Sequence, residues 1–156
     1  MRGLKYRGWT ALADYMGGLM VPAAQALDRP DGTVLVPVPL ARSRLRERGF
    51  NQAELLAHAL SDRVGWPVRC LLRRREGGGA LAGLGREERA RTASAAFELA
   101  PSVGIRGFPV ARVVLVDDVV TTGATAAACA EALTGIGGGA VDVISFARTD
   151  PLGGES

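Results

Sequence analysis

One stretch of the chain places two carboxylates between a hydrophobic run and a turn rich in hydroxyl groups. Residues 113–116 are Val-Val-Leu-Val, Asp117 and Asp118 follow, and residues 121–125 read Thr-Thr-Gly-Ala-Thr. The amides and hydroxyls of such a turn, with the positive end of a following helix behind them, suit a phosphate group, and glycine lets the backbone approach it closely. The carboxylates suit a sugar diol or a hydrated Mg²⁺. Together these groups predict a ribose-phosphate site.

The same stretch predicts the elements that position this site. A short β-branched run is typical of a buried parallel strand, here residues 112–116, and open α/β sheets bind ligands at the carboxyl ends of such strands. A helix is expected over residues 123–133. A simpler interpretation is that the aspartates cap a helix and the glycine permits a turn, but one cap explains only one aspartate and one threonine. The residues expected to bind ribose 5-phosphate are Asp117, Asp118, Val119, Thr121, Thr122, Gly123, Ala124 and Thr125.

The composition is that of one compact domain. The 156 residues include 21 glycines, and 47% are apolar, which excludes a disordered or fibrous protein. We expect one domain over residues 1–150 and a frayed tail at 151–156. No apolar run is long enough for a membrane span, and the N-terminal residues lack the pattern of a signal peptide, so a cytoplasmic protein is expected. Two cysteines and one histidine predict buried free thiols at Cys70 and Cys129 rather than a zinc site.

The positive charge is almost entirely arginine. Eighteen of the 19 cationic residues are Arg, with one cluster at alternate positions 42–48 and another at residues 73–75. Arginine favours bidentate contacts to phosphate, which predicts a possible surface for single-stranded DNA, although solvated arginine faces are also common. The few aromatic residues argue against a protein dedicated to stacking nucleotide bases.

The rest of the chain alternates strands and helices. An amphipathic helix is expected over residues 4–27, a strand over 33–36, a helix over 52–63 capped by Asn51, and a last core strand over 141–146. His58 lies in the expected helix over residues 52–63 and is expected to be a surface or packed residue. This order predicts an α/β fold: a doubly wound, mainly parallel sheet with helices on both faces.

Two prolines follow the strand at residues 33–36. The sequence Pro37-Val38-Pro39 prevents ladder pairing and fixes the backbone at the rim of the sheet. Such a loop can present N–H groups to an anion, beginning with that of Val38. A plain end of the strand explains the prolines equally well.

Residues 113–125 resemble the ribose-phosphate motif of the type I phosphoribosyltransferases. Residues 36–40, Val-Pro-Val-Pro-Leu, followed by Arg42 and by residues 48–52, Arg-Gly-Phe-Asn-Gln, are similar to the ComF family, a phosphoribosyltransferase-like group linked to natural competence and DNA transformation. This resemblance extends from residue 4 to residue 148. It implies a type I phosphoribosyltransferase-like fold, 5-phosphoribosyl 1-diphosphate as ligand, Mg²⁺ held mainly by ligand and water, and possible homodimers. It also implies catalytic roles for Asp117 and Asp118, and a diphosphate side formed by Pro37, Val38, Pro39, Arg42 and Arg48.

The sequence departs from the family in two places. Many members begin with a four-cysteine zinc segment, whereas this sequence has two cysteines in all. The region about 73–92, which the resemblance implies is a mobile hood, carries a glycine-rich run where members have polar residues. Three functions therefore stay open: a phosphoribosyltransferase with an acceptor that no motif names, a non-catalytic metabolite-binding module, and a competence protein that handles single-stranded DNA.

Overall fold

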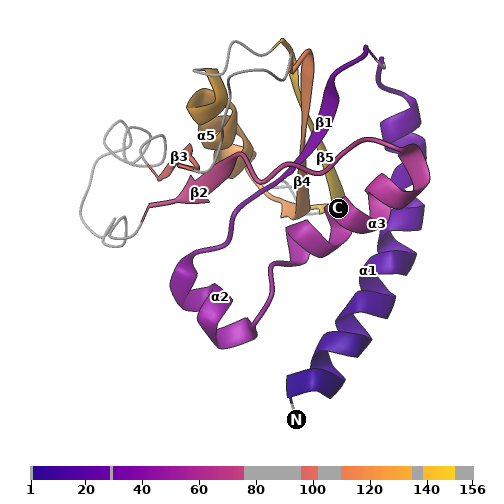
Figure 1. The fold of residues 1–156 in the computed structure, drawn as a ribbon, viewed down its shortest axis with the longest axis vertical. Coiled ribbons are helices and arrows are strands. Elements are labelled where there is room, and N and C mark those ends of the chain that lie inside the picture. Colours follow the sequence, from indigo (N-terminus) through magenta and orange to yellow (C-terminus); the bar gives the residue numbers. More distant parts are fainter. Residues whose placement is uncertain (1, 29, 76–95, 102–109, 135–138, 150–156) are drawn as a thin grey trace, which may run out of the picture.

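The computed structural model describes residues 2–28, 30–75, 96–101, 110–134 and 139–149. At its centre lies a parallel sheet of three strands in the order β1-β4-β5 (Figure 1). β4 (Arg112–Val120) lies between β1 (Thr33–Pro37) and β5 (Val141–Arg148). Leu35 of β1 stands opposite Val114 of β4. Because all three strands are parallel, their carboxyl ends meet at one edge of the sheet.

Two helices cover one face of this sheet. α1 (Arg2–Gln25) and α3 (Gln52–Val64) pack on Leu35, Val114 and Val116, which are all fully buried. The strands consist mainly of valine and leucine, residues that can fill a core on both faces, and this composition accounts for a buried parallel sheet. This core holds α1 and α3 in place beside the sheet edge.

α1 and α3 approach each other closely at a glycine. A Cβ atom added to Gly17 would lie 2.6 Å from the Cβ of Ala59, closer than real Cβ atoms come. On the outside of the same contact, Arg63 Nη2 lies 2.9 Å from Asp14 Oδ1. α1 continues through Pro22 to its end.

The other face of the sheet is covered by one helix and a small ribbon. α5 (Ala124–Leu133) packs against Val113 and Leu115. Beside it lie β2 (Leu72–Arg74) and β3 (Phe97–Leu99), which pair antiparallel. Helices thus lie on both faces of a parallel sheet, so the predicted α/β fold is confirmed.

α2 (Arg42–Arg48) is a short helix that the sequence pattern did not predict. None of its residues is buried, and it ends at Gly49, whose φ of 86° lies in the left-handed region. A helix with no buried side chain leaves no hydrophobic periodicity in the sequence, which is why the sequence predicted no element for these arginines.

Several sequence expectations need correction. β4 continues to Val120 rather than ending at residue 116, because its ladder with β5 extends that far. β5 is an edge strand among the described residues, with Ile144 as its only buried side chain, rather than a core strand. Cys70 is exposed and only Cys129 is buried, because Cys70 lies in the surface segment before β2. Most of the expected hood and the tail at 151–156 lie outside the described residues.

Candidate functional site

The two carboxylates of the predicted site lie inside β4 near its carboxyl end. Asp117 stands opposite Ser145 of β5, and both aspartates are half-buried. After Val120 the chain leaves the sheet for the turn before α5. The acidic pair and the turn therefore occupy the edge where β1 and β5 also end, as predicted, although the aspartates belong to the strand rather than follow it.

The turn after β4 is open to solvent and leads directly into a helix. Gly123 has a φ of 77°, which L side chains rarely adopt, and it is the N-cap of α5. Thr121, Thr122 and Thr125 are exposed. Since a glycine has no side chain to cap the helix, amides of its first turn remain available to an anion. Ala124 N–H donates over 3.3 Å to Thr122 Oγ1.

Each aspartate accepts a hydrogen bond from the next backbone amide. Asp118 N–H donates to Asp117 Oδ1 over 2.9 Å, and Val119 N–H donates to Asp118 Oδ1 over 2.9 Å. The pKa of Asp117 is raised from 3.8 to about 6, mainly by burial and also by the charge of Asp118, against the opposing effect of the backbone hydrogen bond. Ionising Asp117 therefore costs free energy. A residue that served only as a cap would not need a carboxylate that carries this cost.

The loop after β1 differs from its prediction. Val38 N–H donates to Val116 O over 2.9 Å, so the ladder with β4 continues past Pro37 and this amide does not face an anion. The side chain of Val38 is buried, which fixes that pairing. Pro39 follows outside the ladder. Asn51 ties this loop to α3: its Nδ2 donates to Val38 O over 3.0 Å, while its Oδ1 accepts from Ala53 N–H over 3.2 Å.

The arginines expected on the diphosphate side lie on α2. Arg42 opens the helix and Arg48 closes it, and both are exposed. Arg42 also lines a hollow of about 230 Å³ together with four residues of the β2–β3 ribbon. We call it the basic hollow, and its lining residues are Arg42, Arg73, Arg74, Arg75 and Glu98.

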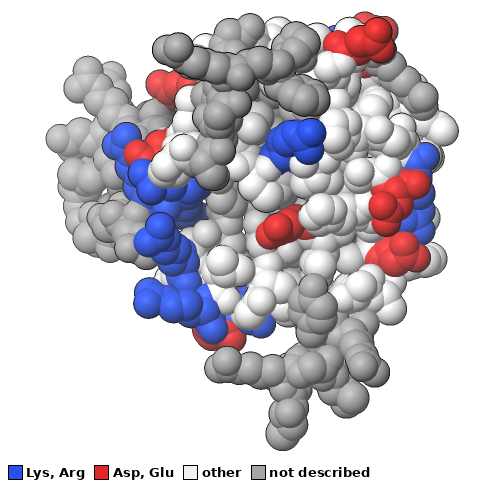
Figure 2. Space-filling view, in the orientation of Figure 1, with Lys and Arg blue, Asp and Glu red and all other residues white. Residues whose placement is uncertain are grey.

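The β2–β3 ribbon divides its arginines between two faces. Glu98 lies 2.8 Å from Arg73 Nε through one carboxylate oxygen and 2.8 Å from Arg75 Nε through the other, and these contacts lower the Glu98 pKa. Arg74 instead lies over the ring of Phe97, 5.4 Å from its centroid. Figure 2 shows the resulting positive surface over α2 and β2 at the left of the molecule. One glutamate thus offsets only part of the charge of the basic hollow.

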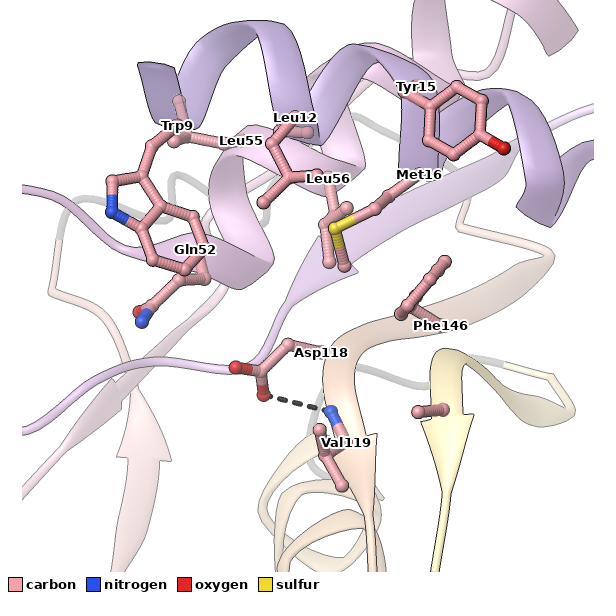
Figure 3. Close-up of a pocket in the computed structure, with 12 residues that line it drawn as sticks. Trp9, Leu12, Tyr15, Met16, Gln52, Leu55, Leu56, Asp118, Val119 and Phe146 are labelled. Carbon is pink, nitrogen blue, oxygen red and sulfur yellow. Dashed lines mark hydrogen bonds between the residues drawn. The ribbon is translucent and has the colours of Figure 1, made fainter. Parts of the chain in front are cut away.

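A second, apolar cavity was missed from the sequence. It holds about 400 Å³ between α1, α3 and the ends of β4 and β5 (Figure 3). We call it the aromatic pocket, and its lining residues are Trp9, Leu12, Ala13, Tyr15, Met16, Gln52, Leu55, Leu56, Asp118, Val119, Phe146 and Ala147. The available signal was a second apolar stripe on α1, at positions 9, 12, 16 and 19, beside the stripe that packs on the sheet. Asp118 therefore belongs both to the predicted site and to this pocket.

The remaining candidates are peripheral. His58 is exposed on α3, as a surface histidine would be. Cys70 Sγ lies 3.9 Å from Glu54 Oε1, and burial together with that carboxylate raises the pKa of Cys70. Within the described ranges, no group of three or more His, Cys, Asp or Glu side chains is arranged to hold a metal ion. No described helix has the length and apolar character needed to cross a membrane.

Comparison with known proteins gives relatives by sequence. No protein-family model matches the chain. The chain is 36% identical over 115 residues to Competence protein F of Haemophilus influenzae, a match that covers 73% of this chain and 49% of that protein. It is 35% identical over 133 residues to DNA utilization protein YhgH of Salmonella typhimurium (84% and 55% covered), and 38% identical over 120 residues to YhgH of Escherichia coli (74% and 49%). The chain spans about half the length of these curated relatives.

Among solved structures, the chain is similar to an adenine phosphoribosyltransferase from Thermoanaerobacter pseudethanolicus. The TM-score is 0.45 at 20% identity, over 88% of this chain and 80% of that one. The sequence matches to Competence protein F and the YhgH proteins confirm the resemblance of this chain to the ComF family.

Proposed function

We propose that this chain binds 5-phosphoribosyl 1-diphosphate with Mg²⁺ at the carboxyl edge of its sheet and transfers the ribosyl phosphate to an acceptor. One observation carries the proposal. A single segment leads from two half-buried carboxylates on β4, through an exposed turn with Gly123 in the left-handed region, into the first turn of α5. Each part matches one part of a ribose phosphate.

The residues divide the ligand between them. The turn amides and the hydroxyls of Thr121, Thr122 and Thr125 would bind the 5-phosphate, and Asp117 and Asp118 would accept hydrogen bonds from the ribose hydroxyls. Arg42, at the start of α2, is the candidate for the diphosphate. Transfer breaks the bond from C1 of the ribose to the diphosphate oxygen, which leaves with the electron pair, and forms a bond from C1 to the acceptor. The protein contributes positioning and electrostatics rather than a nucleophile.

The acidic pair also fits a hydrated Mg²⁺. Carboxylate oxygens are the hard ligands that this ion prefers, and it commonly keeps several waters while ligand phosphates complete its shell. Asp118 is the candidate to hold such a water, since burial raises the pKa of Asp117 and so makes that carboxyl costly to ionise. The ion would offset the charge of the leaving diphosphate.

Calorimetric titration with 5-phosphoribosyl 1-diphosphate, with and without Mg²⁺, tests the binding. We expect Mg²⁺-dependent binding that Asp118→Asn weakens by about 1–3 kcal/mol, the usual effect of removing one partner of a charged hydrogen bond. Thr122→Val should weaken the binding of both 5-phosphoribosyl 1-diphosphate and ribose 5-phosphate. Folded protein that binds neither ligand at millimolar concentration would refute the assignment.

Matched substitutions separate binding from folding. Thr134→Val removes a hydroxyl at the other end of α5, where Thr134 Oγ1 donates to Glu131 O over 2.7 Å. Asp62→Asn removes an exposed carboxylate on α3. Neither should change the titrations. Diphosphate release in the presence of candidate acceptors then distinguishes a transferase from a non-catalytic binding module.

The basic hollow supports a second candidate function, contact with single-stranded DNA. Four arginines line it against one glutamate, and it lies open on the surface. Binding is expected to be weak, independent of sequence and strongly dependent on salt. Replacing Arg73, Arg74 and Arg75 by Ser should lower the slope of log K against log salt by about 0.7 for each phosphate that the variant no longer neutralises. If the slope matches that of the control Arg69→Ser, these arginines are a solvated face.

A further inference from the structure

The aromatic pocket collects exposed apolar side chains that the proposed ribose-phosphate site does not use. Among the described residues, eight large hydrophobic side chains are exposed, and five of them line this one cavity. These five are Trp9, Leu12, Tyr15, Val119 and Phe146. Soluble proteins rarely gather exposed apolar groups without a ligand or partner that covers them. A cavity of about 400 Å³ has the size of a small-molecule site.

The walls of the pocket are aromatic on two sides. Leu12 and Met16 point from α1 toward Asp118 and Phe146, and the Trp9 ring lies beside Gln52, as Figure 3 shows. The Trp9 ring contacts the ring of Phe50, with centroids 5.7 Å apart and planes inclined by 46°. This contact fixes the orientation of the indole. A planar ring in the pocket would therefore contact aromatic side chains that are already oriented for stacking.

Two lining side chains carry an amide or a carboxylate group. They are Gln52 at the start of α3 and Asp118 on β4, and Figure 3 shows both on the Trp9 side of the cavity. One oxygen of Asp118 accepts from Val119 N–H, and a carboxylate can accept further hydrogen bonds at its second oxygen. The ligand must therefore carry a donor on one edge. Its other edges meet hydrocarbon.

We propose that the aromatic pocket binds a planar, mostly apolar ring system with an N–H donor on one edge, of the indole or benzimidazole class. Asp118 lines both this pocket and the candidate ribose-phosphate site, so the ring lies where a ribosyl acceptor would be needed. That role as acceptor rests on the proposed function, whereas binding of the ring itself does not.

The polarity of the pocket discriminates between possible occupants. A purine such as hypoxanthine has hydrogen-bonding groups around most of its edge, and the apolar walls would leave several of them without partners. A second copy of the chain laid across α1 would cover Trp9 and Tyr15, but it gives no reason for a hollow that reaches Gln52 and Asp118. A small ring accounts for the hollow, the aromatic walls and the polar end together.

Titration of the whole chain with benzimidazole, followed by calorimetry and by tryptophan emission, tests the proposal. Trp9 lines the pocket, while Trp66 is buried elsewhere and gives a constant background. We expect saturable binding with a dissociation constant on the order of 1 mM or below, and at least about tenfold weaker binding of hypoxanthine. Phe146→Ala should lower the affinity for benzimidazole by about fivefold or more, which is the lower end of the range for loss of a stacking surface.

Two further variants test whether benzimidazole binds in the aromatic pocket. Leu12→Trp enlarges an exposed side chain that points into the cavity and should abolish the binding. Leu19→Ala removes an exposed side chain of α1 that does not line the cavity, and binding should not change. The proposal is overturned if the folded parent does not bind benzimidazole, if Leu12→Trp binds it as the parent does, or if sedimentation shows a dimer that buries Trp9 and excludes the ring.

The two proposals fail separately. If the protein binds benzimidazole but not 5-phosphoribosyl 1-diphosphate, the assignment of the pocket holds and its role as a ribosyl-acceptor site is refuted. If the protein binds 5-phosphoribosyl 1-diphosphate but not benzimidazole, the pocket is not the acceptor site and the ribose-phosphate assignment is unaffected.

Discussion

Replacing Asp117 by Asn is expected to stabilise the protein at neutral pH. Burial is the largest cause that raises the pKa of this carboxyl, from 3.8 to about 6. A folded-state pKa above the unfolded value means that the folded protein holds the proton more tightly. The associated stability is fully present below pH 3.8 and is lost as the pH rises through about 6. The parent should therefore lose stability across this interval.

The magnitude follows from the size of the shift. Each pKa unit corresponds to about 1.4 kcal/mol, so a shift of roughly two units gives about 3 kcal/mol. Because the Asp117 side chain is only half-buried, solvent screening reduces this to about 1–2 kcal/mol. Asp117→Asn should raise the free energy of unfolding at pH 7.5 by this amount, and the gain should vanish near pH 4.

Urea unfolding of parent and variant at a series of pH values measures the difference. Asp118→Asn provides an internal check, because the Asp118 charge is one cause of the raised pKa, and its removal should move the transition of Asp117 to lower pH. Asp62→Asn, at an exposed site on α3, should leave the profile unchanged. A stability difference between parent and Asp117→Asn that does not vary with pH would refute the reasoning.

Three further changes test packing, capping and charge. Gly17→Ala should destabilise the protein by about 1–3 kcal/mol, because its Cβ would meet that of Ala59 at 2.6 Å, whereas Gly18→Ala, whose nearest contact is 3.5 Å away, should be neutral or stabilise by about 1 kcal/mol in thermal melts. Asn51→Ala removes both the N-cap of α3 and the bond to the loop after β1, and should lower the free energy of unfolding by about 1–2 kcal/mol in urea. Glu98→Gln removes the counter-charge of two arginines and should strengthen binding of single-stranded DNA at low salt, measured by anisotropy.

The sequence predicted those parts of the site that depend on neighbouring residues. The order of strand, acidic pair, turn and helix is written in consecutive positions, and Asn51 capped α3 as expected because a cap acts within a few residues. The parallel sheet followed from three β-branched runs separated by helical segments.

What escaped prediction depends on contacts between distant segments. Val38 N–H was expected to face an anion, but its partner is Val116, a residue of another strand. The aromatic pocket joins four separate parts of the chain, and on α1 alone Trp9 and Leu12 look like ordinary apolar positions. Whether the two arginine clusters meet could not be predicted from spacing either. Arg42 and the β2–β3 ribbon share one hollow only because the fold brings them together.

The energetic cost at Asp117 bears on what the acidic pair is for. An asparagine at this position would keep an oxygen to accept from Asp118 N–H without the penalty for burying a charge. Folding therefore does not require a carboxylate there. With a pKa of about 6 the group is mostly ionised near pH 7, when it accepts hydrogen bonds as a full charge. This cost, at the open edge of the sheet beside the turn that begins α5, supports the proposal of a ligand with hydroxyl groups at that edge.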